Sequence, residues 1–350
     1  MKLKHIHIDN YKLFHDFDID FCDGNEPLRI VVIAGINGIG KSTLLEYIRP
    51  KNMSSTSTGT IQVAIDGVDK SFVIPPSVFQ NLDYRKAFGS ILYFGANDTG
   101  NNSQDLEKKI VRYVDYFVYE EGKTSFEAYE KIQALLDTVF ADFHLQVRFK
   151  GLNADRQLRF VNRDGVEFGV AGLSDGEKQL LTKVFPLFMG DMKGRVILMD
   201  EPDSSLHPSW QTYLLPILRR CAEENDCQFI LATHSPQIIS SAHREEICIL
   251  TRNDQGAVCA EHCEEGPYGW TVEKVLGEIQ NVPVQRVPEI EKELNDLRNA
   301  IREKRYTEEG FQQRMKKLEN LLGYSDPDLT LIRMEIMRNR KKGETNEENK

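Results

Sequence analysis

The side chains best suited to chemistry lie in a glycine-rich stretch that ends in a lysine and two hydroxyl residues. Residues 35–43 read Gly-Ile-Asn-Gly-Ile-Gly-Lys-Ser-Thr and follow the mainly apolar run 28–34. This pattern is typical of a loop whose backbone N–H groups, lysine and hydroxyl bind nucleotide phosphates and Mg²⁺. The pattern needs a buried strand before it and a helix after it, and the run 28–34 and residues 41–48 supply both.

The residue types of this loop have physical reasons. Glycine permits backbone angles that are closed to other residues, so successive N–H groups can converge on phosphate oxygens. Lys41 is predicted to reach the β- and γ-phosphates, and Ser42 to complete the coordination of Mg²⁺. For this loop alone, a glycine-rich turn with a chance lysine is the alternative. The predicted nucleotide-binding residues of the loop are Gly35, Asn37, Gly38, Ile39, Gly40, Lys41, Ser42 and Thr43.

Two further apolar runs end in ionisable residues. Residues 195–201 end in two carboxylates, and a continuous apolar run is typical of a strand buried on both faces. Asp200 is predicted to hold the metal through its water shell, and Glu201 to orient and deprotonate the attacking water. Residues 229–234 end in His234, which is suited to sensing a γ-phosphate or holding the water. Strands that simply end in solvated polar residues are the alternative for each run.

A second helix start has the properties of an anion site. Residues 172–179 read Gly-Leu-Ser-Asp-Gly-Glu-Lys-Gln and precede an apolar helix. Ser174 and Glu177 have the spacing of a capping box, so the helix is predicted to begin at the serine. Its free N–H groups and its dipole favour an anion without a lysine. One chain needs only one phosphate-binding loop for its own nucleotide, so a second such helix end is explained if it binds the nucleotide of another subunit.

The order and spacing of these four stretches resemble the ATP-binding-cassette ATPases. The resemblance implies that residues 173–177 are the signature motif and that residues 200–201 belong to the second Walker motif. It also implies a head-to-tail dimer that encloses two ATP molecules, each between the phosphate loop of one copy and the signature residues of the other. The implied cofactors are ATP and Mg²⁺. The implied catalytic residues are Glu201, Lys41 and His234, the metal-binding residues Ser42 and Asp200, and the signature contacts Ser174, Asp175, Gly176 and Glu177.

Two other stretches narrow the resemblance. Residues 8–14 are similar to the opening of RecF-like, SMC-like and OLD-like ATPases, in which an asparagine and a basic residue lie near the nucleotide. Asn10 and Lys12 are therefore candidates, with an exposed hairpin turn as the alternative. Residues 202–208, Pro-Asp-Ser-Ser-Leu-His-Pro, resemble the OLD-like, RecF-like and PtuA-like group and depart from transporter cassettes.

The resemblance leaves one part of the site open. Such ATPases place a glutamine on a metal-linked loop, and Gln80 and Asn97 are the two candidates for that position.

Between residues 35 and 174 there is no sustained heptad run of the kind found in long-armed SMC proteins, so we expect a compact head.

The predicted fold class is α/β, a P-loop NTPase of the ABC-ATPase type with a mixed sheet core, an antiparallel β subdomain and a helical signature lobe. Residues 1–21 alternate polar and apolar residues, which predicts an antiparallel strand pair with one solvent-facing side. Residues 106–143 show helical periodicity at the position of the helical lobe, about 101–190. The ATPase head is predicted over 1–265.

A helical interaction region is predicted over 266–342. Two apolar series with helical spacing predict an antiparallel helix pair with a narrow seam, the second helix capped by Thr307. A short third helix is expected over 329–337, then the basic cluster 338–342 and a disordered tail over 343–350. The seam either packs on the head or docks a second protein or dimer, and the basic cluster is either solvated or a nucleic-acid contact. The seam residues are Ile290, Leu294, Leu297, Ile301, Phe311, Met315, Leu318 and Leu322.

Composition bounds the remaining possibilities. The chain has 350 residues and a formal net charge of −10, which argues against a protein that coats nucleic acid by charge alone. It has no apolar run of membrane-spanning length and no apolar signal segment, so we expect a cytoplasmic protein without a membrane partner. The six cysteines are expected to be reduced thiols, although 259–263 leaves a zinc site as the alternative.

These observations predict an ATPase of the OLD-like or PtuA-like kind. Its ATP-bound dimer, or a higher oligomer, is expected to regulate or recruit a separate effector such as a nuclease in bacterial anti-phage defence. OLD nucleases carry an acidic Toprim cluster, and none is recognisable after His234, so we expect another chain to cut any DNA. The alternatives are a RecF-like DNA-repair ATPase that contacts DNA directly and the ATP-binding subunit of an ABC transporter.

Overall fold

The computed structural model describes residues 1–49, 57–74, 87–89, 91–95, 103–139, 147–189, 192–204, 206–282 and 286–347. The chain divides into two compact units, 1–281 and 282–350. The first unit extends beyond the predicted boundary at residue 265, because helix α9 (Val272–Glu278) is part of it. Val275 of this helix and Ile279, the residue that caps it, are buried in the same core as the central sheet.

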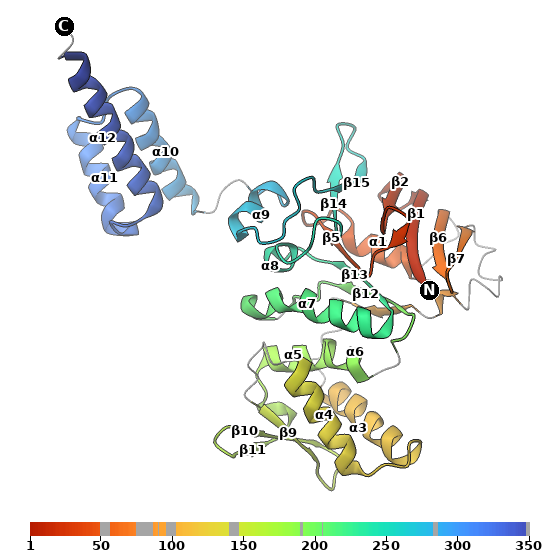
Figure 1. Ribbon diagram of the computed structural model, residues 1–350. Helices are drawn as coiled ribbons and strands as arrows, with labels where there is room; N and C mark the ends of the chain where they lie inside the picture. The colour runs from red at the N-terminus through yellow and green to blue at the C-terminus, as the bar shows by residue number, and fades with distance from the viewer. Residues whose placement is uncertain are drawn as a thin grey trace. The chain divides into compact units, whose positions relative to one another are not determined.

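The centre of the first unit is a six-stranded sheet with the order β15-β14-β5-β13-β12-β8 (Figure 1). All residues of β5, β12 and β13 are buried, as expected for continuous apolar runs covered on both faces. The five strands other than β15 are parallel, so the loops that follow β5, β12 and β13 leave the same edge of the sheet. Ligands of open parallel sheets bind at this edge. The strands are β5 (Ile30–Ala34), β8 (Leu92–Phe94), β12 (Val196–Asp200), β13 (Gln228–Ala232), β14 (Ile247–Arg252) and β15 (Val258–His262).

A second, antiparallel sheet has the order β2-β1-β6-β7 and confirms the predicted strand pair at the start of the chain. Its apolar side shares a core with one face of the central sheet and with helix α1 (Lys41–Ile48), while its polar side faces solvent. The short strands β3 (Cys22–Asp23) and β4 (Glu26–Pro27) form a hairpin before β5. The sheet consists of β1 (Lys2–Tyr11), β2 (Phe14–Asp20), β6 (Thr58–Ile65) and β7 (Val68–Ile74).

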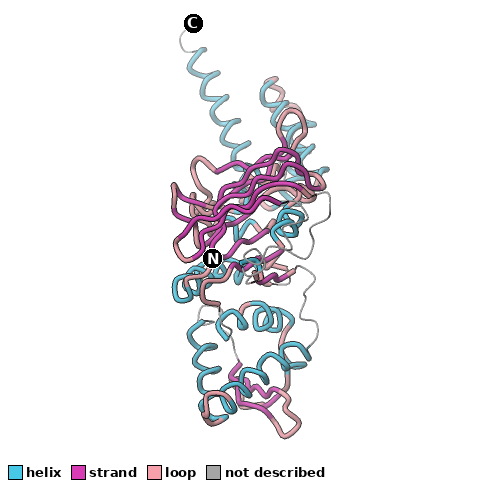
Figure 2. Tube along the Cα trace, turned by 90° about the vertical axis from the view of Figure 1, so that its right-hand side faces the viewer, coloured by secondary structure: helices cyan, strands magenta, loops and turns pink. Residues whose placement is uncertain are grey.

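The other face of the central sheet packs on helices, and these helices share an apolar core with a lobe formed by residues between 103 and 189 (Figure 1). Helices α7 (Pro208–Asn225) and α8 (Pro236–Ile239) bury their apolar residues in the same core as this lobe. In Figure 2 the strands of the two larger sheets lie together, away from the small sheet of the lobe. The lobe contains α3 (Ser103–Tyr119), α4 (Ser125–Val139), β9 (Val147–Leu152), β10 (Leu158–Asn162), β11 (Glu167–Phe168), η4 (Val170–Gly172), α5 (Asp175–Lys183) and α6 (Phe185–Met189).

In its described residues the second unit contains three helices, α10 (Pro288–Arg302), α11 (Glu309–Leu322) and α12 (Pro327–Glu347). Its buried residues are Leu294, Leu297, Ile301, Phe311, Met315, Leu318, Leu329 and Ile332, so the inner positions of the predicted seam meet as expected. No helix in the described parts of the chain is both long and apolar enough to cross a membrane.

Two predicted details of this unit differ from the structure. Glu308 is the residue before α11 and makes no side-chain cap, so Thr307 is not the helix cap. Helix α12 ends at Glu347 rather than at 337 and includes part of the tail that was predicted to be disordered. Residues 338–347 lack proline and are rich in arginine, lysine and glutamate, which favour helix continuation.

Candidate nucleotide site

The glycine-rich loop after β5 is held by close backbone packing. Gly35 has φ 143°, and a Cβ there would lie 2.7 Å from the carbonyl oxygen of Leu250. Gly40 has φ 115°, and a Cβ there would lie 2.7 Å from the side chain of Leu13 in the β1–β2 turn. Because both positions combine positive φ with a close neighbour, glycine is required for the shape of the loop.

The ammonium group of Lys41 lies across this loop. Its Nζ donates to the carbonyl oxygens of Gly35 at 3.0 Å and Ile36 at 3.2 Å. Burial lowers the pKa of Lys41, and the carboxylates of Glu201 and Asp200 act in the opposite direction. A buried cation beside converging backbone N–H groups is the arrangement that compensates phosphate charge.

Ser42 and Asp200 bring the start of α1 and the end of β12 together. Ser42 Oγ donates to Asp200 Oδ1 at 2.8 Å, and the hydroxyl of Tyr93 in β8 donates to Oδ2 at 3.3 Å. Neighbouring ligands about 2.05 Å from an octahedral Mg²⁺ are separated by about 2.9 Å. The two oxygens therefore fit adjacent positions in a magnesium coordination shell.

The environment of Asp200 predicts that its ionised carboxylate lowers the stability of the folded protein in the absence of Mg²⁺. Burial raises the pKa of Asp200, and the hydrogen bonds from Ser42 and Tyr93 oppose this shift. A raised pKa means that the folded protein carries a cost for the ionised group above that pKa, and that the cost disappears as the pH falls through it. Without nucleotide or Mg²⁺, Asp200→Asn should therefore raise the melting temperature near pH 7.5 by about 2–4 °C. The difference from wild type should shrink toward the ordinary pKa range of aspartate; a constant difference at all pH values would contradict this account.

Glu201 and His234 lie side by side at the ends of β12 and β13. His234 Nδ1 is 2.6 Å from Glu201 Oε2, and the backbone N–H of Glu201 donates to Ala232 at 2.8 Å. Burial raises the pKa of Glu201, which the contact with His234 partly offsets. Glu201 has φ 47°, a conformation that is costly for a residue with a Cβ and is concentrated at functional sites. The structure thus places a carboxylate and an imidazole together at the edge where the phosphate loop begins.

A buried polar network behind this pair was not recognised in the sequence. Thr233 Oγ1 donates to Asp203 Oδ1 at 2.5 Å, and the backbone N–H of Ser235 donates to the same hydroxyl at 2.9 Å. At the surface, outside the buried contacts, Gln280 Nε2 donates to the carbonyl oxygen of His234 at 2.5 Å. The network ties the loops after β12 and β13 together and fixes the backbone that carries both ionisable side chains.

The predicted capping box is present at the start of α5. Ser174 Oγ accepts from the backbone N–H of Glu177 at 3.3 Å, and the carboxylate of Glu177 accepts from the N–H of Ser174 at 2.8 Å. Ser174 and Asp175 are exposed to solvent. A Cβ on Gly176 would lie 2.8 Å from the ring of Trp210 in α7, so only glycine permits this close packing.

The remaining candidates have different surroundings. Lys12 lies in the β1–β2 turn with φ 51°, and its Nζ pairs with Glu46 of α1 at 2.6 Å. Asn10 is exposed at the end of β1, opposite His15. The turn thus borders the phosphate loop, while the ammonium of Lys12 is directed to a carboxylate of the following helix.

Gln80 and Asn97 lie outside the described residues. Of the other loop residues, Asn37 is exposed, Thr43 is half-buried and Ile39 is buried in the core.

Two family models match the chain. The first, described as an AAA ATPase domain, matches residues 1–50. The second, described as an AAA domain, putative AbiEii toxin, Type IV TA system, matches residues 94–240. Together the two matched ranges contain the phosphate loop, β12 with Asp200 at its end, and β13 with His234 two residues beyond it.

Individual proteins extend this likeness. The Septu protein PtuA of Bacillus thuringiensis is 21% identical, and the match covers 95% of this chain and 97% of that protein. The Retron Ec83 probable ATPase of Escherichia coli is 27% identical over 50% of this chain, and the match spans only 33% of that relative. An Smc head bound to the C-winged helix domain of ScpA is a solved structure with a TM-score of 0.54 and 16% identity, covering 76% of this chain and 99% of its own. This structural likeness supports the fold alone.

The glycine-rich loop with its buried lysine, the strand end with two carboxylates and the ABC-type arrangement of sheets and lobe agree with both family matches. The chain is an ATPase with the α/β fold of ABC-type P-loop ATPases, and parts of it match two AAA-domain family models.

Proposed function

We propose that the chain hydrolyses ATP in composite sites of a head-to-tail dimer and that the nucleotide state of the dimer controls a separate effector in anti-phage defence. The exposed capping box at the start of α5 carries the first part of this proposal. A helix end with free N–H groups favours an anion, and a solvent-facing one can reach the phosphates of a second copy.

Within one copy, each side chain has a distinct task in this proposal. Lys41 compensates the charge of the β- and γ-phosphates, while Ser42 and Asp200 hold Mg²⁺, directly or through water. Glu201 accepts the proton of the attacking water, and His234 orients that carboxylate through the 2.6 Å contact. When bound, Mg²⁺ supplies electrostatic stabilisation of the transferred phosphoryl group.

The three-helix unit is the proposed contact for the effector. Helix α12 exposes Leu331, Met334 and Met337, which are three residues apart and therefore lie along one side of the helix. Exposed apolar side chains grouped in this way are typical of protein interaction surfaces. The match to the PtuA relative covers 95% of this chain and therefore most of this unit. We therefore propose a nuclease, or another effector of a defence system, as the partner.

The dimer is tested with Ser174→Arg. The added side chain occupies the exposed helix end that is meant to meet the other copy's triphosphate, so ATP turnover should fall at least about 100-fold. ATP binding to the isolated chain should stay within about twofold of wild type, because Ser174 is not part of that chain's own phosphate loop. Thr124→Arg is the matched control: Thr124 and Glu127 form the same capping arrangement at the start of α4, and its loss should leave turnover unchanged.

Mixing variants separates action across the dimer from damage within one copy. Ser174→Arg provides an intact phosphate loop, and Lys41→Ala provides an intact α5 start. If sites are composite, the mixture should regain a substantial fraction of the turnover that each variant alone lacks. A mixture as inactive as its components, together with wild type that stays monomeric with ATP, would rule out the head-to-tail arrangement.

The effector contact is tested with Met334→Asp. A charge on the exposed apolar row of α12 should prevent the partner from co-purifying with the ATP-bound protein while ATP turnover remains at the wild-type level. Lys316→Asp, on the exposed side of α11, is the control for charge. Unchanged co-purification with Met334→Asp would show that this row is not the contact. Recovery of bare DNA or of a membrane protein instead of an effector would favour a repair or transport function.

A further inference from the structure

The polar side of the β1–β2 pair carries histidines and aspartates in facing positions. His5 and His7 are two residues apart on β1, and Asp16 and Asp18 are two residues apart on β2. Alternate residues of a strand share a face, and the antiparallel register pairs His7 with Asp18. The apolar residues between them are buried in the core, so the strands hold the polar side chains outward. None of these residues belongs to the nucleotide site.

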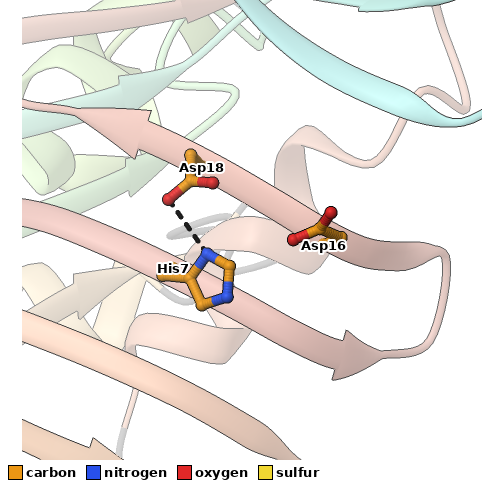
Figure 3. Close-up of side chains that lie close together, drawn as sticks. All are labelled: His7, Asp16 and Asp18. Atoms are coloured by element: carbon orange, nitrogen blue, oxygen red, sulfur yellow. Dashed lines mark hydrogen bonds and ion pairs between the residues drawn. The ribbon is translucent and has the colours of Figure 1, made fainter.

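The donor atoms of three of these residues converge. His7 Nδ1 lies 3.0 Å from Asp18 Oδ1, and one donor atom each of His7, Asp16 and Asp18 lies within 4.8 Å of the others. Figure 3 shows His7 and Asp18 facing each other, with Asp16 beside them on the same strand as Asp18. Ligands about 2.0–2.2 Å from a tetrahedral zinc ion lie about 3.3–3.6 Å apart, so a small outward shift of the nitrogen and oxygen would give them the separation of neighbouring ligands.

The second nitrogen of His7 also has a carboxylate partner. Nε2 lies 3.0 Å from Asp9 Oδ1, which fits a donated N–H. If the proton is on Nε2, the lone pair of Nδ1 faces the carboxylate of Asp18. Nδ1 and Asp18 Oδ1 are then two acceptors 3.0 Å apart, and they repel each other unless a cation lies between them. A metal-binding histidine characteristically donates its other N–H to a carboxylate in this way.

The remaining neighbours strengthen the negative field. His5 Nε2 lies 3.2 Å from the same oxygen of Asp18 and can orient that carboxylate. Asp9, Asp16 and Asp18 are exposed and together carry three negative charges over a small area. A divalent ion would offset most of this charge, whereas a single proton on His7 offsets one.

We propose that His7, Asp16 and Asp18 bind a divalent transition-metal ion of the zinc class, with Asp9 orienting His7 and His5 orienting Asp18. Imidazole nitrogen selects such ions over Mg²⁺, which prefers oxygen ligands. Three protein ligands leave a further position for water or for a side chain of a partner.

The experiment uses the full chain after treatment with a chelator and dialysis. Co²⁺ is titrated in excess Mg²⁺, which competes for the oxygen-rich nucleotide site, and binding is followed by visible absorption and calorimetry. Wild type should bind one equivalent of Co²⁺ per chain at this site, and Zn²⁺ should displace it. If wild type binds no Co²⁺ under these conditions, a proton joins His7 to Asp18 and the proposal is wrong.

Variants locate the ion. His7→Ala and Asp18→Asn should each lose the equivalent, while Asp9→Asn should retain it with about 10–100-fold weaker affinity. His15→Ala is the matched control, because His15 is exposed in the same hairpin and joins no such donor group among the described residues. Unchanged ATP turnover in Mg²⁺ would show that the His7→Ala protein is folded. Equal Co²⁺ binding by wild type and folded His7→Ala would overturn the assignment.

Discussion

Glu201→Gln is expected to stop ATP turnover while ATP remains bound. The glutamine has nearly the same shape, but its amide cannot accept the proton of the attacking water. A missing general base of this kind costs about 10²–10⁴-fold in rate, or about 3–5 kcal/mol of transition-state stabilisation. ATP affinity should be kept, because Lys41 and the glycine-rich loop, where we propose that the phosphates bind, are unchanged.

Turnover is measured as phosphate release, and assembly by size-exclusion chromatography with ATP. In the proposed head-to-tail dimer the copies separate after hydrolysis, so the variant should elute as a dimer for as long as ATP is present. Glu223→Gln, an exposed glutamate of α7, is the matched control and should behave as wild type. If Glu201→Gln turns over ATP at the wild-type rate, another group is the base, and Asp203, buried one residue beyond Pro202, is the next candidate.

The capping box and the strand ends of the site could be predicted because each depends on residues that are close together in the sequence. The capping box needs only Ser174 and Glu177, three residues apart, and the structure contains it. The strand ends at Asp200 and Ala232 follow apolar runs long enough to be identified as buried strands. Such signals depend on spacing within a few residues, which the sequence displays directly.

The contacts between loops could not be predicted in the same way. Tyr93 reaches Asp200 only because β8 pairs with β12, and Gln280 reaches His234 across 46 positions of sequence. Thr233 and Asp203 form a buried pair whose members look like ordinary strand-end residues in isolation. These residues have no local pattern, because their roles arise from which strands become neighbours.

Two further details concern Lys12 and the end of the chain. The ammonium of Lys12 pairs with Glu46, a residue of α1 that approaches it only in the folded chain, while its place near the nucleotide stays a prediction. Helix α12 continues past 337 because its polar residues favour helix, although composition alone suggested a disordered tail. The Lys12 pair is a tertiary contact, whereas the length of α12 follows a local helix preference.

The polar side of the β1–β2 pair illustrates the opposite case. Alternation identified a solvent-facing side correctly, but it did not distinguish an ordinary polar surface from converging ligands. The antiparallel register supplies that distinction, since it sets His7 opposite Asp18. A shift by one residue would turn these side chains into the core, and the buried apolar residues of β1 and β2 exclude that shift.

Lys41→Ala is expected to remove both ATP binding and hydrolysis. Burial lowers the pKa of Lys41, and the nearby carboxylates of Glu201, Asp200 and Asp203 oppose this shift. Without the ammonium, the phosphates of ATP would face these carboxylates with no positive side chain at this position. We expect ATP affinity to fall at least about 100-fold, or about 2.7 kcal/mol, with turnover too slow to detect. Affinity is measured with a fluorescent ATP analogue and by calorimetry. Lys150→Ala removes an exposed lysine of the lobe and should change neither quantity.

A thermal melt without nucleotide separates this effect from misfolding. Lys41 Nζ donates to the carbonyls of Gly35 and Ile36, so alanine leaves two acceptors of the loop without this donor. A moderate loss of stability is therefore expected, but a cooperative melt should remain because the strands and α1 are held by the apolar core. If a folded Lys41→Ala protein binds ATP with wild-type affinity, the phosphates do not lie at this loop. The assignments of Ser42, Asp200 and Glu201 would then fail with it, because all three are placed relative to the same phosphates.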